Sequence, residues 1–338
     1  MPRTWSVVAP FFYSGPSDQW IDNHVHDDRW AFQKIARAPS RDNWHARSKR
    51  ATGLTTWIDY WKQSRRAFPA SGVITVFPQL ALTAAAQKQL FRWNVPIIAW
   101  TFNLGQFPGG WKRAAARTLL RGVDRIIVHS TGEVDRVSEF LDARPGTVEF
   151  VPLQRAPIPI EASEDTRSPF IVAMGSANRD YETFFKAAEL TGLPCKVVAS
   201  PLSIEGLRIP DNVSVESGLD YSACHRLVQR SRFSVVPLLD PEIASGQVTV
   251  IESMRMNRAV ISTESIGTTD YIRTGLSGVL VPPQDPQALA QAMLELWEDQ
   301  SLRGAYADKA RRFAETSLSD AAAAAALTRI MSAVELQG

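Results

Sequence analysis

The sequence has little cysteine and no long apolar run. Only two of its 338 residues are cysteines, Cys195 and Cys224, and they do not form a C-x-x-C pair. Neither a disulfide framework nor a zinc site is therefore expected. No apolar run approaches the ~20 residues that a membrane-spanning helix needs. The first residues lack the apolar stretch and cleavage site of a signal peptide. We therefore expect a cytoplasmic protein.

Several functional patterns are also missing. The chain has no internal repeats and no recognisable nucleic-acid-binding module, so no nucleic-acid partner is expected. The loop "GSAN" at 175–178 is not a G-x-G-x-x-G sequence, which disfavours a dinucleotide-dependent oxidoreductase. The stretch "NHVHDD" at 23–28 has the residue types of a metal site, but this pattern is too weak to predict one.

Charge and tryptophan divide the chain into two unlike halves. Residues 1–160 carry 21 Lys and Arg against 12 Asp and Glu, a net charge of +9, whereas residues 161–338 carry 16 against 23, which is −7. Nine of the ten tryptophans lie at or before Trp111. A length of 338 residues also suits two domains of roughly 150 residues each. We predict domains at 1–155 and 165–317, joined through a proline-rich linker.

Short apolar runs alternate with helical patterns in both halves. In the first half, strands are expected at 5–12, 72–78, 95–100 and 123–130, and helices at 79–92, 110–122 and 131–142. In the second half, strands are expected at 169–176, 194–200, 212–217, 232–238, 258–263 and 277–283, before a mainly helical stretch from 285 to 337. This alternation predicts an α/β protein, with two doubly wound Rossmann-like domains that face a cleft.

The stretch "ASGQVTVIESM" at 244–254 places a glycine turn directly before a helix. Free N–H groups at a helix N-terminus bind anions, so this turn and helix start would hold phosphate groups. The candidate phosphate ligands are Ser245, Gly246, Gln247, Val248 and Thr249. Glu252 follows among apolar neighbours, and two interpretations stay open for it: a ligand for sugar hydroxyls or a solvated helix residue.

Three stretches of the second half resemble one known family. They are "VVPLLDPEIASGQVTVIESMRMNRAVIST", "IGTTDYIRTGLSGVLVPPQDPQALAQAM" and, more weakly, "VAMGSANRDYETFFKAA". They are similar to the donor-binding half of GT-B glycosyltransferases, and most similar to glycosyltransferase family 4. The resemblance implies an acceptor-binding domain first, a nucleotide-sugar domain second, and a final helix at about 318–338 that packs back on the first domain.

The resemblance also assigns roles in donor binding. It implies that Glu252 accepts hydrogen bonds from the ribose hydroxyls and that Arg179, where the family has a lysine, pairs with the diphosphate. Further candidate donor-binding positions are Gly15, Gly175 and Ser176, the last of which stands where the family usually has an arginine. Ala244 replaces the family's first glutamate, which orients the transferred sugar, and Glu242 would have to substitute for it.

Candidates for the acceptor side come from the first half. Asn103 follows the strand expected at 95–100, and Asp27 would assist the acceptor hydroxyl, with Asp18 and Asp28 as alternatives. Basic residues spaced four apart predict a helical stripe, formed by Arg113, Arg117, Arg121 and Arg125. This stripe is either a solvated face or a contact with an anionic membrane surface.

The resemblance implies transfer of a sugar from a nucleoside-diphosphate sugar to a hydroxyl of a glycan or lipid-linked acceptor. It implies retention at the anomeric carbon and no metal or other cofactor. A peripheral position on the inner face of the cell membrane would suit such an acceptor. Two alternatives stay open: a GT-B-fold sugar-nucleotide epimerase or hydrolase, and a non-catalytic, two-lobed small-molecule binding protein.

Overall fold

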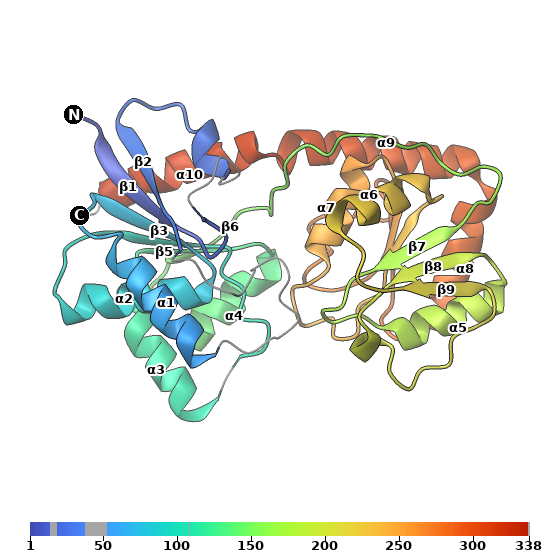
Figure 1. Cartoon of the computed structure of the whole chain (residues 1–338), viewed down its shortest axis with the longest axis horizontal. Coiled ribbons are helices and arrows are strands. Elements are labelled where there is room, and N and C mark those ends of the chain that lie inside the picture. The colour runs from blue at the N-terminus through green and yellow to red at the C-terminus, as the bar shows by residue number, and fades with distance from the viewer. Residues whose placement is uncertain (14–18, 38–52, 108, 337–338) are drawn as a thin grey trace. The chain divides into compact units, whose positions relative to one another are not determined.

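The computed structural model describes residues 1–13, 19–37, 53–107 and 109–336. The chain forms two compact units (Figure 1). The first comprises Met1–Pro152 and Asp320–Gly338, and the second comprises Leu153–Ser319. The chain therefore enters its second unit at the start of the proline-rich segment, and helix α10 (Asp320–Glu335) belongs to the first unit.

The first unit is built on a parallel six-stranded sheet. Its strands are β1 (Arg3–Val8), β2 (Trp30–Ile35), β3 (Gly72–Val76), β4 (Ile97–Trp100), β5 (Arg125–Val128) and β6 (Val148–Phe150). Their order across the sheet is β2-β1-β3-β4-β5-β6. Because every neighbour is parallel, the carboxyl ends of all six strands lie along one edge.

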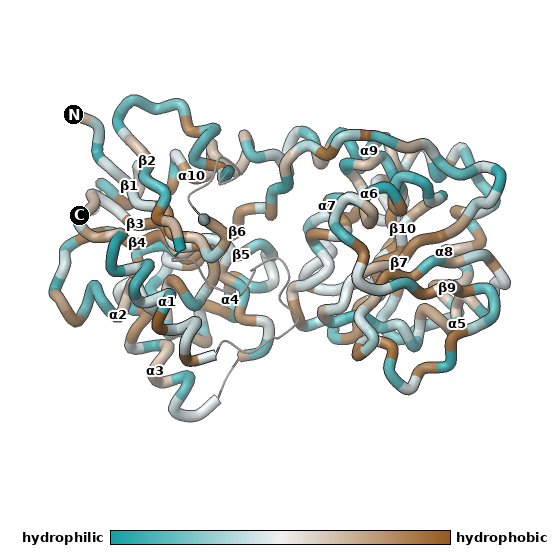
Figure 2. The backbone as a smooth tube through the Cα atoms, in the orientation of Figure 1, coloured by the Kyte–Doolittle hydropathy of each residue, from teal (hydrophilic) through white to brown (hydrophobic). Residues whose placement is uncertain are grey.

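Helices cover both faces of this sheet. One face packs against α1 (Leu54–Arg65), α2 (Pro78–Leu90), α3 (Gly110–Leu120) and α4 (Thr131–Leu141). The other face packs against the short 3-10 helix η1 (Ile21–His24) and α10. Burial on both faces explains why the central strands are almost entirely apolar. Figure 2 shows this hydrophobic colouring along the strands of both sheets.

The second unit repeats this plan. Its strands are β7 (Ile171–Met174), β8 (Cys195–Val198), β9 (Val213–Glu216), β10 (Ser234–Val236), β11 (Val260–Thr263) and β12 (Val279–Val281). All are parallel, in the order β12-β11-β10-β7-β8-β9. The helices are α5 (Tyr181–Thr191), η3 (Pro201–Ser203), α6 (Tyr221–Arg230), α7 (Gln247–Arg255), α8 (Pro286–Glu298) and α9 (Gln300–Ser317). The predicted fold of two doubly wound α/β domains is confirmed.

Three elements of the first unit were not predicted from the sequence: α1, β2 and β6. Helix α1 buries polar residues and exposes apolar ones, which inverts the usual helical pattern. Strand β2 lies at the sheet edge, and its mixed burial gives no apolar run. Strand β6 has only three residues. The first strand also ends at Val8, not at residue 12 as predicted.

Candidate functional site

The order of the strands in the second sheet creates a topological switch point at its carboxyl edge. Strand β7 lies between β8 and β10. The chain runs from β7 through α5 to β8 on one side, and from β10 through α7 to β11 on the other. The loops that follow β7 and β10 therefore diverge. In doubly wound sheets ligands bind at such a switch point.

Helix α7 begins at this point with free N–H groups. Its N-cap, Gly246, has a φ of 85°, a left-handed conformation that glycine adopts without strain. No side chain caps the helix. Within the described part of the chain, the backbone N–H groups of Val248 and Thr249 have no hydrogen-bond acceptor. The first turn of α7 therefore offers donors to an anion, as predicted from the sequence.

Arg179 brings a positive charge to the same helix start. Its Nη2 donates to Thr249 Oγ1 at 3.0 Å, while Nε donates to the carbonyl oxygen of Met174 at 3.0 Å and Nη1 to that of Ala177 at 2.8 Å. All three acceptors are neutral. Among the residues that the structure describes, no carboxylate pairs with this guanidinium. Burial lowers the pKa of Arg179, as expected for a charge without a counter-ion.

Gly175 allows the Arg179 side chain to take this path. Its φ is 116°, and a Cβ atom at this position would lie 2.6 Å from Arg179 Nη2. Any larger residue would therefore push the guanidinium away from Thr249. Ser176, the next predicted ligand, is exposed, and its Oγ accepts a hydrogen bond from the Ser200 N–H group at 3.3 Å. This hydrogen bond directs Ser176 toward the loop after β8.

Asn178 links the loop after β7 to the loop after β10, and this role was not predicted from the sequence. Its Nδ2 donates to the Asp240 carbonyl at 2.9 Å and to Ser245 Oγ at 2.8 Å. Its Oδ1 accepts from the Asp240 N–H group at 3.0 Å. Asn178 also has a φ of 54°. Asparagine tolerates the left-handed conformation better than most residues, so the "GSAN" loop could have indicated it.

Glu252 is buried on α7, so it is not a solvated helix residue. Its Oε1 accepts hydrogen bonds from Arg155 Nη2 and from the Tyr221 hydroxyl. His225 Nε2 lies 3.6 Å from Oε2. Oε2 itself makes no hydrogen bond within the described residues. One carboxylate oxygen thus accepts two hydrogen bonds from the protein, and the other lies beside the His225 imidazole.

These neighbours keep the Glu252 carboxyl ionised. Burial alone would raise its pKa, but the His225 imidazole and the Arg155 guanidinium outweigh burial and hold the pKa below its ordinary value. Arg155 comes from the segment before β7 and Tyr221 from the start of α6. They lie 97 and 31 positions from Glu252, so no local pattern could have indicated them.

Ala244, which replaces the family's first glutamate, lies buried in the turn before α7. Glu242, two residues earlier, is exposed, and its backbone N–H group donates to Asp240 Oδ1 at 2.9 Å. The structure therefore holds the backbone of this turn in place, whereas a contact between Glu242 and a sugar stays a prediction.

The candidates of the first unit lie at opposite edges of its sheet. Asn103 follows β4 at the carboxyl edge, and its Oδ1 accepts from the Gly105 N–H group at 2.7 Å. Asp27 precedes β2 at the amino edge, where it pairs with Arg29 at 2.8 Å. The hydrogen bond from Arg29 holds the pKa of Asp27 below its ordinary value, which makes Asp27 a weaker base. Asp27 and Asn103 are thus not brought together. Gly15 lies outside the described residues.

The predicted arginine stripe is wrong as one helical face. Helix α3 ends at Leu120, and Arg125 begins β5. Arg117 donates to the carbonyl oxygens of Phe140 and Glu139, at 2.7 and 3.0 Å, and Arg113 reaches the same two oxygens at 3.5 Å. These carbonyls end helix α4, where a positive charge is favourable. Two of the four arginines therefore stabilise a helix C-terminus.

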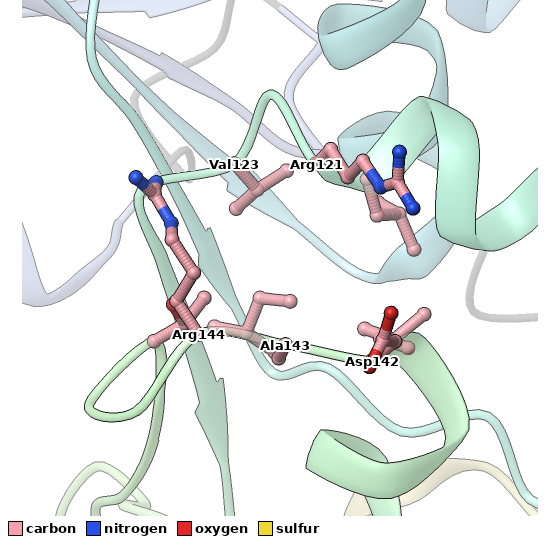
Figure 3. Close-up of a pocket in the computed structure, with 9 residues that line it drawn as sticks. Arg121, Val123, Asp142, Ala143 and Arg144 are labelled. Atoms are coloured by element: carbon pink, nitrogen blue, oxygen red, sulfur yellow. The ribbon is translucent and has the colours of Figure 1, made fainter.

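Arg121 lines a cavity of about 360 Å³ in the first unit (Figure 3). Figure 3 shows Arg121 and Arg144 on opposite sides of this cavity, with Asp142 across from Arg121. The cavity lies beside the amino ends of β5 and β6 and the C-termini of α3 and α4. It therefore lies in a different unit from Arg179 and Glu252 and is no part of their site.

Within the described residues, neither a metal-binding cluster nor a membrane-spanning helix is present. No group of three or more His, Cys, Asp or Glu side chains there could hold a metal ion. None of the helices in the described part is long and apolar enough to cross a membrane.

Comparison with known proteins bears on the second unit and on the fold. Residues 184–299 match the family described as Glycosyl transferases group 1. The O-antigen chain mannosyltransferase C of Escherichia coli is 34% identical over 133 residues. This match covers 37% of the chain and 36% of the relative, so the chain matches about a third of that relative's length.

Solved structures match nearly the whole chain. Sucrose-phosphate synthase from Thermosynechococcus elongatus has a TM-score of 0.74 at 13% identity, covering 99% of this chain and all of the other. HepE of Anabaena, solved with UDP-glucose, has a TM-score of 0.67 at 12% identity, covering 97% and 99%. The galactosyltransferase WaaB, which acts on the lipopolysaccharide outer core, has a TM-score of 0.67 at 13% identity, covering 98% and 99%.

The predicted resemblance to GT-B glycosyltransferases is thereby confirmed, whereas the narrower assignment to family 4 stays a prediction. The chain has the GT-B fold of glycosyltransferase structures, and residues 184–299 of its second unit match the Glycosyl transferases group 1 model.

Proposed function

We propose that this protein is a glycosyltransferase that moves a sugar from a nucleoside-diphosphate sugar to a hydroxyl of a glycan or lipid-linked acceptor. The observation that carries the proposal is the pairing of Arg179, a half-buried cation without a carboxylate partner among the described residues, with the free first turn of α7. HepE was solved with UDP-glucose, and its likeness in fold supports a nucleotide-sugar donor here.

In this proposal the diphosphate binds at the switch point. The Val248 and Thr249 N–H groups and the Arg179 guanidinium contact its oxygens, and the ribose hydroxyls donate to Glu252 Oε2. During transfer the bond between the anomeric carbon and the diphosphate oxygen breaks, the acceptor oxygen bonds to the anomeric carbon, and the proton of the acceptor hydroxyl passes to the departing diphosphate. Negative charge grows on the departing diphosphate, and preorganised donors stabilise that charge. Arg179 supplies the positive charge, so the proposed reaction needs no metal ion.

We further propose retention of configuration at the anomeric carbon and a peripheral position on the inner face of the membrane. Retention follows the family resemblance and is checked by NMR of the product anomer. Asn103 would face the acceptor, because it follows β4 at the carboxyl edge of the first sheet. Glu242 would replace the absent first glutamate from its exposed place in the turn before α7.

The first test is a thermal-shift panel of UDP, GDP, ADP, CDP and TDP, each with and without its common sugars. A ligand at a hundred times its Kd adds about 2.7 kcal/mol to the stability of the folded protein. One base should stand out, and Arg179→Ala should abolish its shift because the diphosphate loses its cation. Arg208→Ala is the matched control, because this exposed arginine pairs with Glu189 on the surface of the same unit.

The outcomes separate the alternatives. Consumption of the sugar nucleotide only when an acceptor glycan is present supports the transferase. Equal consumption without an acceptor would instead indicate a hydrolase, and isomerised donor would indicate an epimerase. No shift from any nucleotide would contradict the donor site and favour a binding protein of another specificity.

A further inference from the structure

The cavity of about 360 Å³ in the first unit lies where helices α3 and α4 end (Figure 3). The apolar part of its lining is formed by Leu120, Val123, Ile126 and Leu141, four buried side chains that belong to one hydrophobic core of this unit. Sites for small molecules are mostly apolar and have volumes of about 300–1,000 Å³. The cavity is therefore large enough for an organic ligand, and its lining suits an apolar one.

Two exposed arginines, Arg121 and Arg144, border this cavity on opposite sides (Figure 3). Their guanidinium groups form no hydrogen bond and no ion pair with any residue that the structure describes. Arg113 and Arg117 of α3, by contrast, reach carbonyl oxygens at the end of α4. The cavity therefore has two guanidinium groups that are available to an anion.

The cavity is also lined by one carboxylate, that of Asp142. This residue ends α4 with a φ of 54° and lies across the cavity from Arg121 (Figure 3). Asp142 forms no ion pair within the described part of the chain, whereas Asp124, just before β5, and Glu149, on β6, both have cationic partners. Two arginines and one aspartate give the lining a net charge of +1. A ligand with a single negative charge complements it.

We propose that this cavity binds a small organic monocarboxylate with an apolar body. The body would contact the aliphatic side chains, and the carboxylate would pair with a guanidinium, which can donate two parallel hydrogen bonds to it. The cavity lies beside the amino ends of β5 and β6, whereas Asn103, the candidate for the acceptor side, follows β4 at the carboxyl edge of the same sheet. The cavity is therefore a ligand site separate from the proposed transfer reaction.

Isothermal titration of the full chain with naphthoate tests the proposal. This probe joins a carboxylate to an apolar ring system, and three matched compounds each change one property. Acetate lacks the rings, naphthylmethanol lacks the charge, and naphthylmethylammonium reverses the charge. Naphthoate should bind at a single site, and each of the other three compounds should bind at least about fivefold more weakly, because it loses the apolar contact or the charged pair.

Substitutions in the lining make the test specific to this cavity. Arg121→Gln together with Arg144→Gln should weaken naphthoate binding about tenfold, because the carboxylate loses its charged donors. Asp142→Asn should strengthen binding about two- to threefold, because a repelling charge is removed. Asparagine also tolerates the left-handed backbone at this position. Arg208→Gln, at an exposed arginine of the second unit, is the matched control and should bind as the parent does.

A variant of the proposed donor site shows where naphthoate binds. Arg179→Ala should bind naphthoate as the parent does, and the variants of the cavity should keep the thermal shift with the selected nucleotide. The cavity proposal and the proposed function can therefore fail separately. Three results would overturn the cavity proposal: no binding of naphthoate, loss of its binding in Arg179→Ala, or equal binding by the parent and the double glutamine variant.

Discussion

Glu252 is buried and Arg179 is half-buried in the second unit, and among the described residues only Glu252 has a partner of opposite charge. Glu252 receives a guanidinium, a hydroxyl and a nearby imidazole, and its pKa falls. Arg179 receives only neutral oxygens, and its pKa falls because burial disfavours its charge. A buried ion without a partner costs free energy that a bound anion would recover. A bound phosphate would supply the charged partner that Arg179 lacks, whereas Glu252 already has one.

Substitution of Glu252 should reveal whether it binds a ribose. In Glu252→Gln, affinity for the ribonucleoside diphosphate chosen by the thermal-shift panel should fall about 10- to 100-fold, because hydrogen bonds to charged groups contribute about 1.5–3 kcal/mol. Affinity for the 2′-deoxy analogue should fall much less. Isothermal titration of both nucleotides measures the difference.

A second variant distinguishes ribose binding from support of the fold. Tyr221→Phe keeps the Glu252 charge but removes the hydroxyl that donates to Oε1. It should reduce discrimination between the two nucleotides without abolishing it. If Glu252→Gln weakens both nucleotides equally, Glu252 serves the local structure and not the sugar.

Helices of the second unit begin at aspartates whose carboxylates accept from first-turn N–H groups. These N-caps are Asp180 for α5, Asp220 for α6, Asp285 for α8 and Asp299 for α9. Helix α7 differs, since Gly246 caps it without a side chain. The unit thus satisfies the N-termini of its structural helices internally and keeps one N-terminus open. This contrast distinguishes α7 from the four helices that begin at an aspartate and is consistent with the proposed diphosphate site.

Loss of one N-cap should destabilise the second unit by a modest amount. Asp285 Oδ1 accepts from the N–H groups of Gln287 and Ala288, at 3.1 and 2.9 Å. Asp285→Ala should therefore lower the free energy of unfolding by about 1 kcal/mol. Urea denaturation followed by circular dichroism measures it, with the exposed Glu205→Ala as control. Equal stability of the two variants would show that the α8 cap contributes nothing.

At the scale of the whole molecule, the two units should respond differently to acid. His129 is buried at the end of β5 in the first unit, where Nδ1 donates to the Val151 carbonyl oxygen at 2.7 Å and Nε2 lies 3.1 Å from Thr101 Oγ1. Burial lowers the pKa of His129 from 6.5 to about 4. The unfolded chain therefore takes up this proton first as the pH falls, and the first unit loses stability between pH 6.5 and 4.

This loss can be measured in the first unit alone, because nine of the ten tryptophans lie at or before Trp111. Tryptophan fluorescence in urea should show the first unit about 2 kcal/mol less stable at pH 5 than at pH 7.5 through His129. His129→Gln should be less stable at pH 7.5 but should lose less on acidification. An unchanged dependence on pH in His129→Gln would contradict this prediction.

The sequence by itself determined the α/β class, most strands and the glycine turn before α7. These features depend on periodicity and on residues close together in the chain, which local patterns report directly. The resemblance to GT-B glycosyltransferases, carried by the motifs around these strands, singled out Arg179 and Glu252, whose roles in donor binding stay predictions. The sequence could not indicate α1, whose buried polar residues and exposed apolar ones invert the pattern on which prediction depends.

Only the tertiary structure decided which side chains meet. The contact of Arg155 and Tyr221 with Glu252, the binding of Arg117 to the end of α4, and the place of Asp27 at the amino edge of its sheet all depend on strand order. Strand order is fixed by the packing of whole elements across long stretches of chain. The same packing placed Arg113 and Arg117 of the predicted arginine stripe at the C-terminus of α4.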